Sequence, residues 1–341
     1  MKINYQPWKI DFSEFEVSNT LEAKLKFFVK FAVLAPSSHN SQPWSFTIQE
    51  NKIIVSPDFS RALPYSDKNH RELYISLGCA IENLRTAANY FGFKTVVDYN
   101  NLDKQVDAVI TFEEYLEDFK SKDCSIFSVV ERSTNRNAHI TKNIELKFKE
   151  WLKTMETSES SIAMVEDSVS KKEIGILILA AMQDAMADRS FRNELAGYLK
   201  SNTTVATLGM PASGFGIPTP LSYLAAIMMR AVNMGKLTRK KDEKLLLQET
   251  EAFLIISTKI DSPIPWIQTG EIYERICLFG TQVGLSMHPW AAVIQIGDHY
   301  RKLQKILPTN FRPQFCCRIG YCRRNGIKSP RLASEKVIIQ N

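Results

Sequence analysis

The sequence predicts an α+β fold made of two similar halves in one chain. A helical stripe, a glycine and a strand follow one another at residues 70–99, and the same order returns at residues 270–296. A loop of small residues also follows an apolar helix in each half, at residues 35–44 and 208–218. The chain has 341 residues, 44% of them hydrophobic and 23% charged, which is ordinary for a folded protein. Repetition of this kind indicates an internal duplication.

The first half begins with a helix that leads into the first small-residue loop. Asn19 or Thr20 can cap this helix, and Pro36 ends it. Apolar residues at helical spacing form its buried stripe: Leu21, Leu25, Phe28 and Ala32. The stretch APSSHNSQPW at residues 35–44 is therefore a loop after a helix.

Alternating and helical patterns predict the next elements. Residues 45–57 alternate polar and apolar side chains around an Asn turn, which indicates a β-hairpin. Residues 70–92 carry a helical stripe that ends at Gly92 and leads into a strand at 94–99.

The second half repeats this order with additions. Residues 174–187 predict an apolar helix, and 188–199 predict a more polar one. The stripe at 270–284 predicts a helix that ends at Gly284, and the apolar run at 291–296 predicts a strand.

We place the halves at residues 1–125 and 126–341. The segment 212–245 has no counterpart in the first half and carries flexible Met228, Met229 and Met234. It is either a lid over the site or an amphipathic segment that completes the core or a subunit contact.

Composition argues against several classes of protein. The net charge is +6, but the densest basic run, residues 238–244, is interrupted by acids and indicates a solvated helix face, so we expect no nucleic-acid partner. Cys316, Cys317 and Cys322 lack the paired spacing of a zinc site, so we expect no metal. The apolar stretches are too short to span a bilayer, and no secretory signal is visible. We therefore expect no membrane anchor and a cytoplasmic location.

Four motifs in order carry a specific resemblance. APSSHNSQPWSF, ERSTNRN, GTQVGLSMHPW and RIGY…SPR together resemble the nitroreductase-like flavoprotein superfamily. Their order and spacing are similar to the Acg branch, in which one chain carries two nitroreductase-like halves. The resemblance covers about residues 20–338 and implies the nitroreductase fold, duplicated so that one chain mimics a dimer.

The resemblance implies bound FMN and assigns its polar contacts to the second half. Arginine suits a phosphate dianion because its planar guanidinium grips two oxygens at once. The site residues implied by RSTNR are Arg132 for the phosphate, Thr134 on the polar side of the flavin, Ser133 as a further cofactor contact, and Arg136 at the pyrimidine edge. KSPR implies Arg331 with Lys328 to close the clamp. Arg132 and Arg136 could instead belong to a surface salt-bridge network with Glu131.

The remaining implied contacts come from two glycine- and serine-rich turns. Backbone amides of Gly284, Leu285 and Ser286 would approach the ring near N5. From the first half, the resemblance brings Pro36, Ser37, Ser38 and Asn40 to the isoalloxazine, while Gln42, Pro43 and Trp44 brace the loop. Loops of this composition are otherwise simple helix terminations with Asx turns.

The function implied is that of an FMN-dependent oxidoreductase. NADH or NADPH would reduce the flavin, and a nitroaromatic, quinone or similar small acceptor would reoxidise it. No side chain is assigned a catalytic step, and His39 and His288 are expected to be structural. The alternative is a protein that stores, sequesters or senses FMN beneath a closed lid, without NAD(P)H turnover.

We expect one flavin per chain. The loop at 209–216 lacks the Asn, and no counterpart of RSTNR precedes Leu21. An internal pseudo-dimer removes the need for a partner chain, so a monomer or a homodimer is possible.

Overall fold

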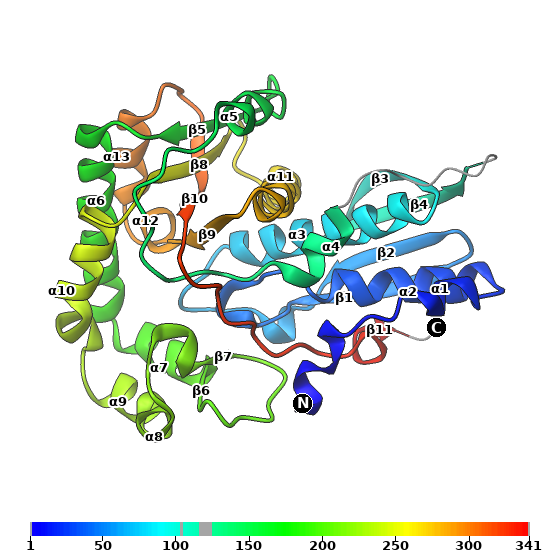
Figure 1. Cartoon of the computed structure of the whole chain (residues 1–341), viewed down its shortest axis with the longest axis horizontal. Helices are drawn as coiled ribbons and strands as arrows, with labels where there is room; N and C mark the ends of the chain where they lie inside the picture. The colour runs from blue at the N-terminus through cyan, green and yellow to red at the C-terminus, as the bar shows by residue number, and fades with distance from the viewer. Residues whose placement is uncertain (1, 103–104, 116–124, 340–341) are drawn as a thin grey trace.

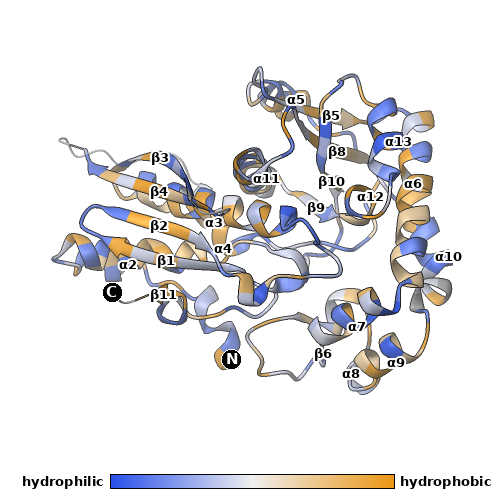
Figure 2. Ribbon diagram, turned by 180° about the vertical axis from the view of Figure 1, so that it is seen from behind, coloured by the Kyte–Doolittle hydropathy of each residue, from blue (hydrophilic) through white to orange (hydrophobic). Residues whose placement is uncertain are grey.

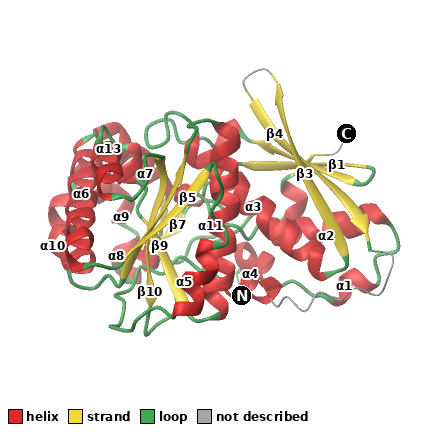
Figure 3. Cartoon of the chain, turned by 90° about the horizontal axis from the view of Figure 1, so that it is seen from above, coloured by secondary structure: helices red, strands yellow, loops and turns green. Residues whose placement is uncertain are grey.

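Two long helices form the centre of the protein, and a β-sheet lies on either side of them (Figures 1 and 3). The computed structural model describes residues 2–102, 105–115 and 125–339. The central helices are α3 (Arg71–Tyr90) and α11 (Pro263–Gln282), one from each predicted half. This arrangement confirms the α+β class and agrees with the predicted duplication.

The first sheet is built from the N-terminal part of the chain and completed by its C-terminal end. Its five strands lie in the order β11 (Ile338–Ile339), β1 (Trp44–Gln49), β2 (Lys52–Pro57), β4 (Gln105–Glu114) and β3 (Phe93–Leu102). The hairpin predicted at 45–57 and the strand predicted at 94–99 are confirmed. Strand β11 pairs in parallel with β1, so the chain end crosses from the second half to the first.

The second sheet has four strands, and every neighbouring pair in it is antiparallel. Its order is β5 (Ser160–Val165), β8 (Ala252–Thr258), β10 (Arg312–Tyr321) and β9 (Leu285–Pro289). A short parallel pair, β6 (Leu199–Lys200) and β7 (Met210–Pro211), stands apart from both sheets.

Helices surround the sheets and carry the loops that matter for function. The remaining α-helices are α1 (Ser13–Glu16), α2 (Leu21–Ala32), α4 (Ser125–Glu131), α5 (Leu146–Lys153), α6 (Ser168–Ala187), α7 (Arg189–Tyr198), α8 (Thr219–Ser222), α9 (Ala225–Ala231), α10 (Met234–Leu247), α12 (Ala292–Gln295) and α13 (His299–Ile306). Short 3-10 turns are η1 (Ile3–Trp8), η2 (Ser38–Asn40), η3 (Phe59–Arg61), η4 (Ala212–Phe215) and η5 (Ser334–Lys336). None of the described helices is long and apolar enough to cross a membrane.

The prediction of a strand at 291–296 is wrong, because this run forms α12. The strand lies just before it, in β9, and pairing ends where the Trp290 amide donates to the carbonyl of Cys316. Val293 and Ile294 are then buried in the cluster that surrounds α6. A short apolar run fits a buried helix as well as a buried strand, and here tertiary packing decides.

Helices α3 and α11 approach so closely that only glycine fits at their crossing. A Cβ atom on Gly78 would lie 1.9 Å from the carbonyl oxygen of Ile267. A Cβ atom on Gly270 would lie 1.9 Å from the carbonyl oxygen of Ile75. The two contacts are equivalent under exchange of the helices, as in a two-fold symmetric dimer interface.

One hydrophobic core spans both halves. It contains Phe46 and Ile110 from the first sheet and Leu254 and Ile319 from the second. A smaller core fills the other face of the second sheet beneath α6, whose apolar residues are visible in Figure 2. Because alternate residues of β8 enter the two cores, both faces of the second sheet are covered.

We predict that Gly270→Ala destabilises the protein by about 3 kcal/mol, because the added methyl meets a backbone carbonyl that cannot move aside. The measurement is urea unfolding followed by circular dichroism. Gly197→Ala is the matched control, since beyond the neighbouring backbone of α7 no heavy atom lies within 4 Å of its added methyl, and it should gain up to about 1 kcal/mol. Equal stability of Gly270→Ala and the parent protein would contradict the close crossing.

Candidate functional site

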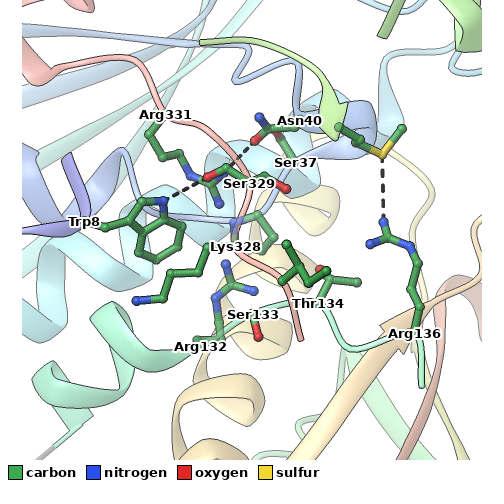
Figure 4. Close-up of a pocket in the computed structure, with 13 residues that line it drawn as sticks. Trp8, Ser37, Asn40, Arg132, Ser133, Thr134, Arg136, Lys328, Ser329 and Arg331 are labelled. Atoms are coloured by element: carbon green, nitrogen blue, oxygen red, sulfur yellow. Dashed lines mark hydrogen bonds between the residues drawn. The ribbon is translucent and has the colours of Figure 1, made fainter. Parts of the chain in front are cut away.

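Segments that are far apart in the sequence line one pocket between the two halves (Figure 4). The loop after α2, the segment after α4 and the segment before η5 each contribute one side. The lining residues are Trp8, Pro36, Ser37, Asn40, Arg132, Ser133, Thr134, Arg136, Met210, Ile327, Lys328, Ser329 and Arg331. The pocket thus collects most of the predicted site residues.

Asn40 ties the loop after α2 to the segment before η5 and to the backbone just before Met210. Its Nδ2 donates to the carbonyls of Gly209 and Pro330, both at 2.9 Å, and its Oδ1 accepts from Arg331 Nη1 at 2.7 Å. The loop reaches this position through left-handed backbone at His39, Asn40 and Gln42. Asparagine tolerates that conformation better than most residues.

Gln42 and Ser37 complete the fixed loop. Gln42 Nε2 donates to the carbonyl of Thr207 at 2.8 Å, and its Oε1 accepts from the amide of Leu332. Ser37 Oγ accepts from the Gln42 amide at 2.9 Å. The small polar side chains of this loop therefore join backbone groups of three segments, and the fully buried Trp44 packs in the core behind them.

Two guanidinium groups from distant segments converge on the end of α2. Arg132 Nη2 and Arg331 Nη2 both donate to the carbonyl of Leu34, at 3.3 and 3.0 Å. Carbonyls at a helix C-terminus carry partial negative charge and favour nearby cations. This convergence brings together the RSTNR and KSPR motifs, as the resemblance implied.

Arg132 pairs with a buried carboxylate and not with a surface network around Glu131. Its Nε lies 3.1 Å from Oε1 of Glu274, which is completely buried in α11. Burial alone would lower the pKa of Arg132, but the Glu274 carboxylate raises it above the usual value. Burial in turn raises the pKa of Glu274 to about 7.

Arg331 and Arg136 have weaker compensation for their charge. Burial and repulsion from Arg132 lower the pKa of Arg331 to about 9. Burial lowers the pKa of Arg136 to about 10, and its guanidinium lies 4.5 Å above the ring of Phe215. The hydrogen bond from Arg136 Nη2 goes to the sulfur of Met210, a weak acceptor, at 3.8 Å.

The pocket therefore suits an anion with several oxygens. Lys328 is a further cation in its lining, and burial lowers the pKa of this side chain. Against these four cations, Glu274 is the carboxylate that the described contacts place in the cluster. Arg331 Nε is buried and has no partner among the described residues. Forked, permanently charged donors in partly dry surroundings are the chemistry that binds a phosphate group.

Four predicted site residues do not line the pocket. Ser38 Oγ donates to Glu72 of α3 at 2.9 Å and so turns away. Leu285 is buried in β9, where it pairs with Tyr321 of β10. Ser286 Oγ accepts from Asn135 Nδ2 at 3.1 Å, one layer behind the RSTNR segment, and Gly284 ends α11 at an exposed turn.

The structure adds Trp8, Met210, Ile327 and Ser329 to the pocket. Met210 belongs to the loop at 209–216, which the sequence suggested for a second, lost site. The amide of Gly209 instead donates to the carbonyl of Asn40 at 3.2 Å, so this loop forms part of the same pocket. Its small residues were the signal that could have revealed it.

The segment 212–245 forms η4, α8, α9 and α10, and its beginning reaches the pocket through Phe215. Helix α9 packs on α7, and α10 packs on α6. The basic run at 238–244, predicted to be a solvated face, belongs to α10 and is exposed or half-buried. Met228 is exposed and Met229 half-buried, while the side chain of Met234 lies outside the described ones. A lid role for this segment stays a prediction.

Comparisons with known proteins agree with the motifs. No protein-family model matches the chain. It is 22% identical to "Probable NAD(P)H nitroreductase PigM" of Serratia sp. over 345 residues, which cover 94% of this chain and 95% of that protein. It is 33% identical over 63 residues to "Putative NAD(P)H nitroreductase acg" of Mycobacterium tuberculosis, or 18% of this chain and 19% of that protein. These relatives confirm the resemblance to Acg-like nitroreductase proteins.

Part of the chain is also similar to solved structures. The FMN and NADPH-dependent nitroreductase NfnB from Sphigopyxis sp. has a TM-score of 0.40 and 14% identity, over 64% of this chain and 99% of that one. Iodotyrosine deiodinase bound to FMN and 3-iodo-L-tyrosine has a TM-score of 0.35 and 15% identity, over 61% and 95%.

The ring of His39 is neutral at physiological pH, because burial lowers its pKa from 6.5 to about 4. Unfolded chains bind a proton there near pH 6.5, so this residue favours unfolding as the pH falls from 6.5 toward 4. We test this with His39→Asn, because asparagine tolerates the local φ of 53°. When the pH falls from 7 to 5, the free energy of unfolding should decrease by about 1 to 2 kcal/mol less for this variant than for the parent protein. Chemical denaturation at both pH values measures this, and identical losses would disprove it.

Proposed function

We propose that this chain is an FMN-dependent NAD(P)H oxidoreductase of the nitroreductase type that binds one FMN in the pocket between its halves. The observation that carries the proposal is the convergence of Arg132 and Arg331 on Leu34, with Lys328 and Arg136 beside them. Two relatives that match over most of the chain, one from Serratia sp. and one from Mycobacterium tuberculosis, are named as NAD(P)H nitroreductases, which supports the proposal. Nitroaromatics, quinones and similar electron-poor molecules are the proposed acceptors.

The residues divide the cofactor between them by chemistry. Arg132, Lys328 and Arg331 would hold the phosphate, since the two arginines converge on the end of α2 and Lys328 lines the pocket with them. Pro36, Ser37 and Asn40 would form a wall fixed by the Asn40 hydrogen bonds. Ser133 and Thr134 would lie along the polar side of the bound group.

When bound, FMN supplies the redox chemistry by accepting a hydride from a nicotinamide and passing two electrons to the acceptor. The protein's part is electrostatic. Arg136 has a pKa of about 10 and stays positively charged at neutral pH. A fixed cation of this kind stabilises negative charge that develops beside it. The ring of His39 is neutral in the same pH range, so the proposal assigns it no acid–base step.

The role of Arg331 can be tested by comparing FMN with riboflavin, which lacks the phosphate. Arg331→Met should weaken FMN binding by about a hundredfold, because a charge-assisted contact with phosphate is lost, and leave riboflavin binding nearly unchanged. Fluorescence titration measures both affinities. Arg301→Met, on the exposed face of α13, is the matched control. An equal loss for both ligands would assign Arg331 a purely structural role.

The activity itself is tested by mixing the FMN-loaded protein with NADPH or NADH without oxygen. We expect the oxidised flavin absorbance to bleach and to return when a quinone or nitroaromatic is added. A flavin that dithionite reduces but neither nucleotide reduces would favour the alternative, an FMN-storing or redox-sensing protein with a covered cofactor.

A further inference from the structure

An N-terminal segment that the sequence motifs left unexplained forms one wall of the pocket. This segment, residues 2–8, contains η1 and is called the N-terminal strap below. Trp8 lines the pocket and is 6% exposed. Figure 4 shows its indole beside Lys328, with the Nε1 hydrogen bond to Ser329 drawn as a dashed line.

The indole of Trp8 contacts two of the four cations. Lys328 Nζ lies 4.7 Å from the ring centroid, and the guanidinium carbon of Arg331 lies 4.8 Å from it. Both distances fall within the range of cation–π attraction, which is stronger where water is excluded. The two cations repel each other, so an electron-rich face beside both offsets part of that repulsion.

Hydrogen bonds fix the strap to the backbone on both sides of Pro330. Trp8 Nε1 donates to the carbonyl of Ser329 at 2.9 Å, and the amide of Arg331 donates to the carbonyl of Asn4 at 2.9 Å. The strap therefore holds the KSPR segment through three groups: the Trp8 ring, the Trp8 Nε1 donor and the carbonyl of Asn4.

The other end of the strap is anchored to the loop that leads to Met210. Asn4, which is buried, donates through Nδ2 to the carbonyls of Thr204 and Ala206, at 3.2 and 2.8 Å. Lys2 Nζ donates to the carbonyl of Asn202 at 2.9 Å. The strap thus connects two segments that line the pocket and are distant in sequence.

We infer that Trp8 is a positioning residue of the phosphate site, which holds Lys328 and Arg331 against their mutual repulsion and closes the pocket, and that the N-terminal strap keeps it there. The inference rests on the proposed function, because it concerns the same FMN pocket. It adds a tryptophan and a segment that none of the four motifs contains.

The test compares FMN and riboflavin dissociation from Trp8→Leu, Trp8→Phe and the parent protein. Trp8→Leu keeps apolar bulk but removes the ring, so FMN should leave at least tenfold faster while riboflavin release changes less than threefold. Trp8→Phe keeps a ring and should lie closer to the parent than to Trp8→Leu. Release is followed by the recovery of free flavin fluorescence after rapid dilution into flavin-free buffer.

Controls separate positioning from stability. Trp151→Leu, in α5 against Phe279, should leave the ratio of FMN to riboflavin release unchanged. Asn4→Ala substitutes no pocket residue and should speed FMN release about threefold by loosening the strap that holds Trp8. This second variant decides the question if Trp8→Leu does not fold.

The outcomes distinguish the two proposals. If the parent protein binds FMN and Trp8→Leu releases FMN and riboflavin with an unchanged ratio, the inference about Trp8 is wrong and the proposed function stands. If Trp8→Phe releases FMN as fast as Trp8→Leu, the ring does not act on the cations and the inference is also wrong. A folded parent protein that binds no FMN would remove both proposals.

Discussion

The crossing of α3 and α11 at Gly78 and Gly270 is the constraint on which the rest of the structure depends. Each helix places backbone against backbone there, so the two halves have one possible separation. The pocket takes Asn40 from one half and Arg132 from the other, and its shape follows from that separation. A bulkier residue at the crossing would push the two halves apart and so separate the walls of the pocket, although no pocket residue would be substituted.

The helix pair is nearly symmetric at its crossing, and one of its departures from symmetry bears on the pocket. Glu82 of α3 pairs bidentately with Arg275 of α11, at 2.7 and 2.6 Å. The equivalent contact joins Glu274 to Asn83. In the orientation that gives both its nitrogen and its oxygen a partner, the Asn83 amide nitrogen donates to Glu274 at 3.0 Å. Because the Asn83 amide carries no charge, the Glu274 carboxylate forms its ion pair with Arg132. This difference explains why the carboxylate of Glu274 joins the cation cluster, while the equivalent carboxylate of Glu82 pairs with Arg275 across the helix pair.

The sequence predicted the elements with clear periodicity and the residues that carry charge. Helix α2 with its Thr20 cap and the hairpin at 45–57 are where the patterns indicated, and Arg132 and Arg331, which the resemblance implied, line one pocket. The short run 291–296 was misassigned because burial without alternation does not distinguish strand from helix. Trp8 carried no signal, since its role arises only when the chain end folds back beside it. Gly78 and Gly270 lie equally far before Gly92 and Gly284, the glycines that follow the two long helices, and this equal spacing could have revealed the crossing.

We propose that one pocket, built from both halves, binds one FMN through its cations. Titration of the flavin-free protein with FMN, followed by fluorescence quenching and checked by equilibrium dialysis, measures the number of sites most directly. We expect saturation at one FMN for each chain. Saturation at two, or a folded protein that takes up none, would contradict it.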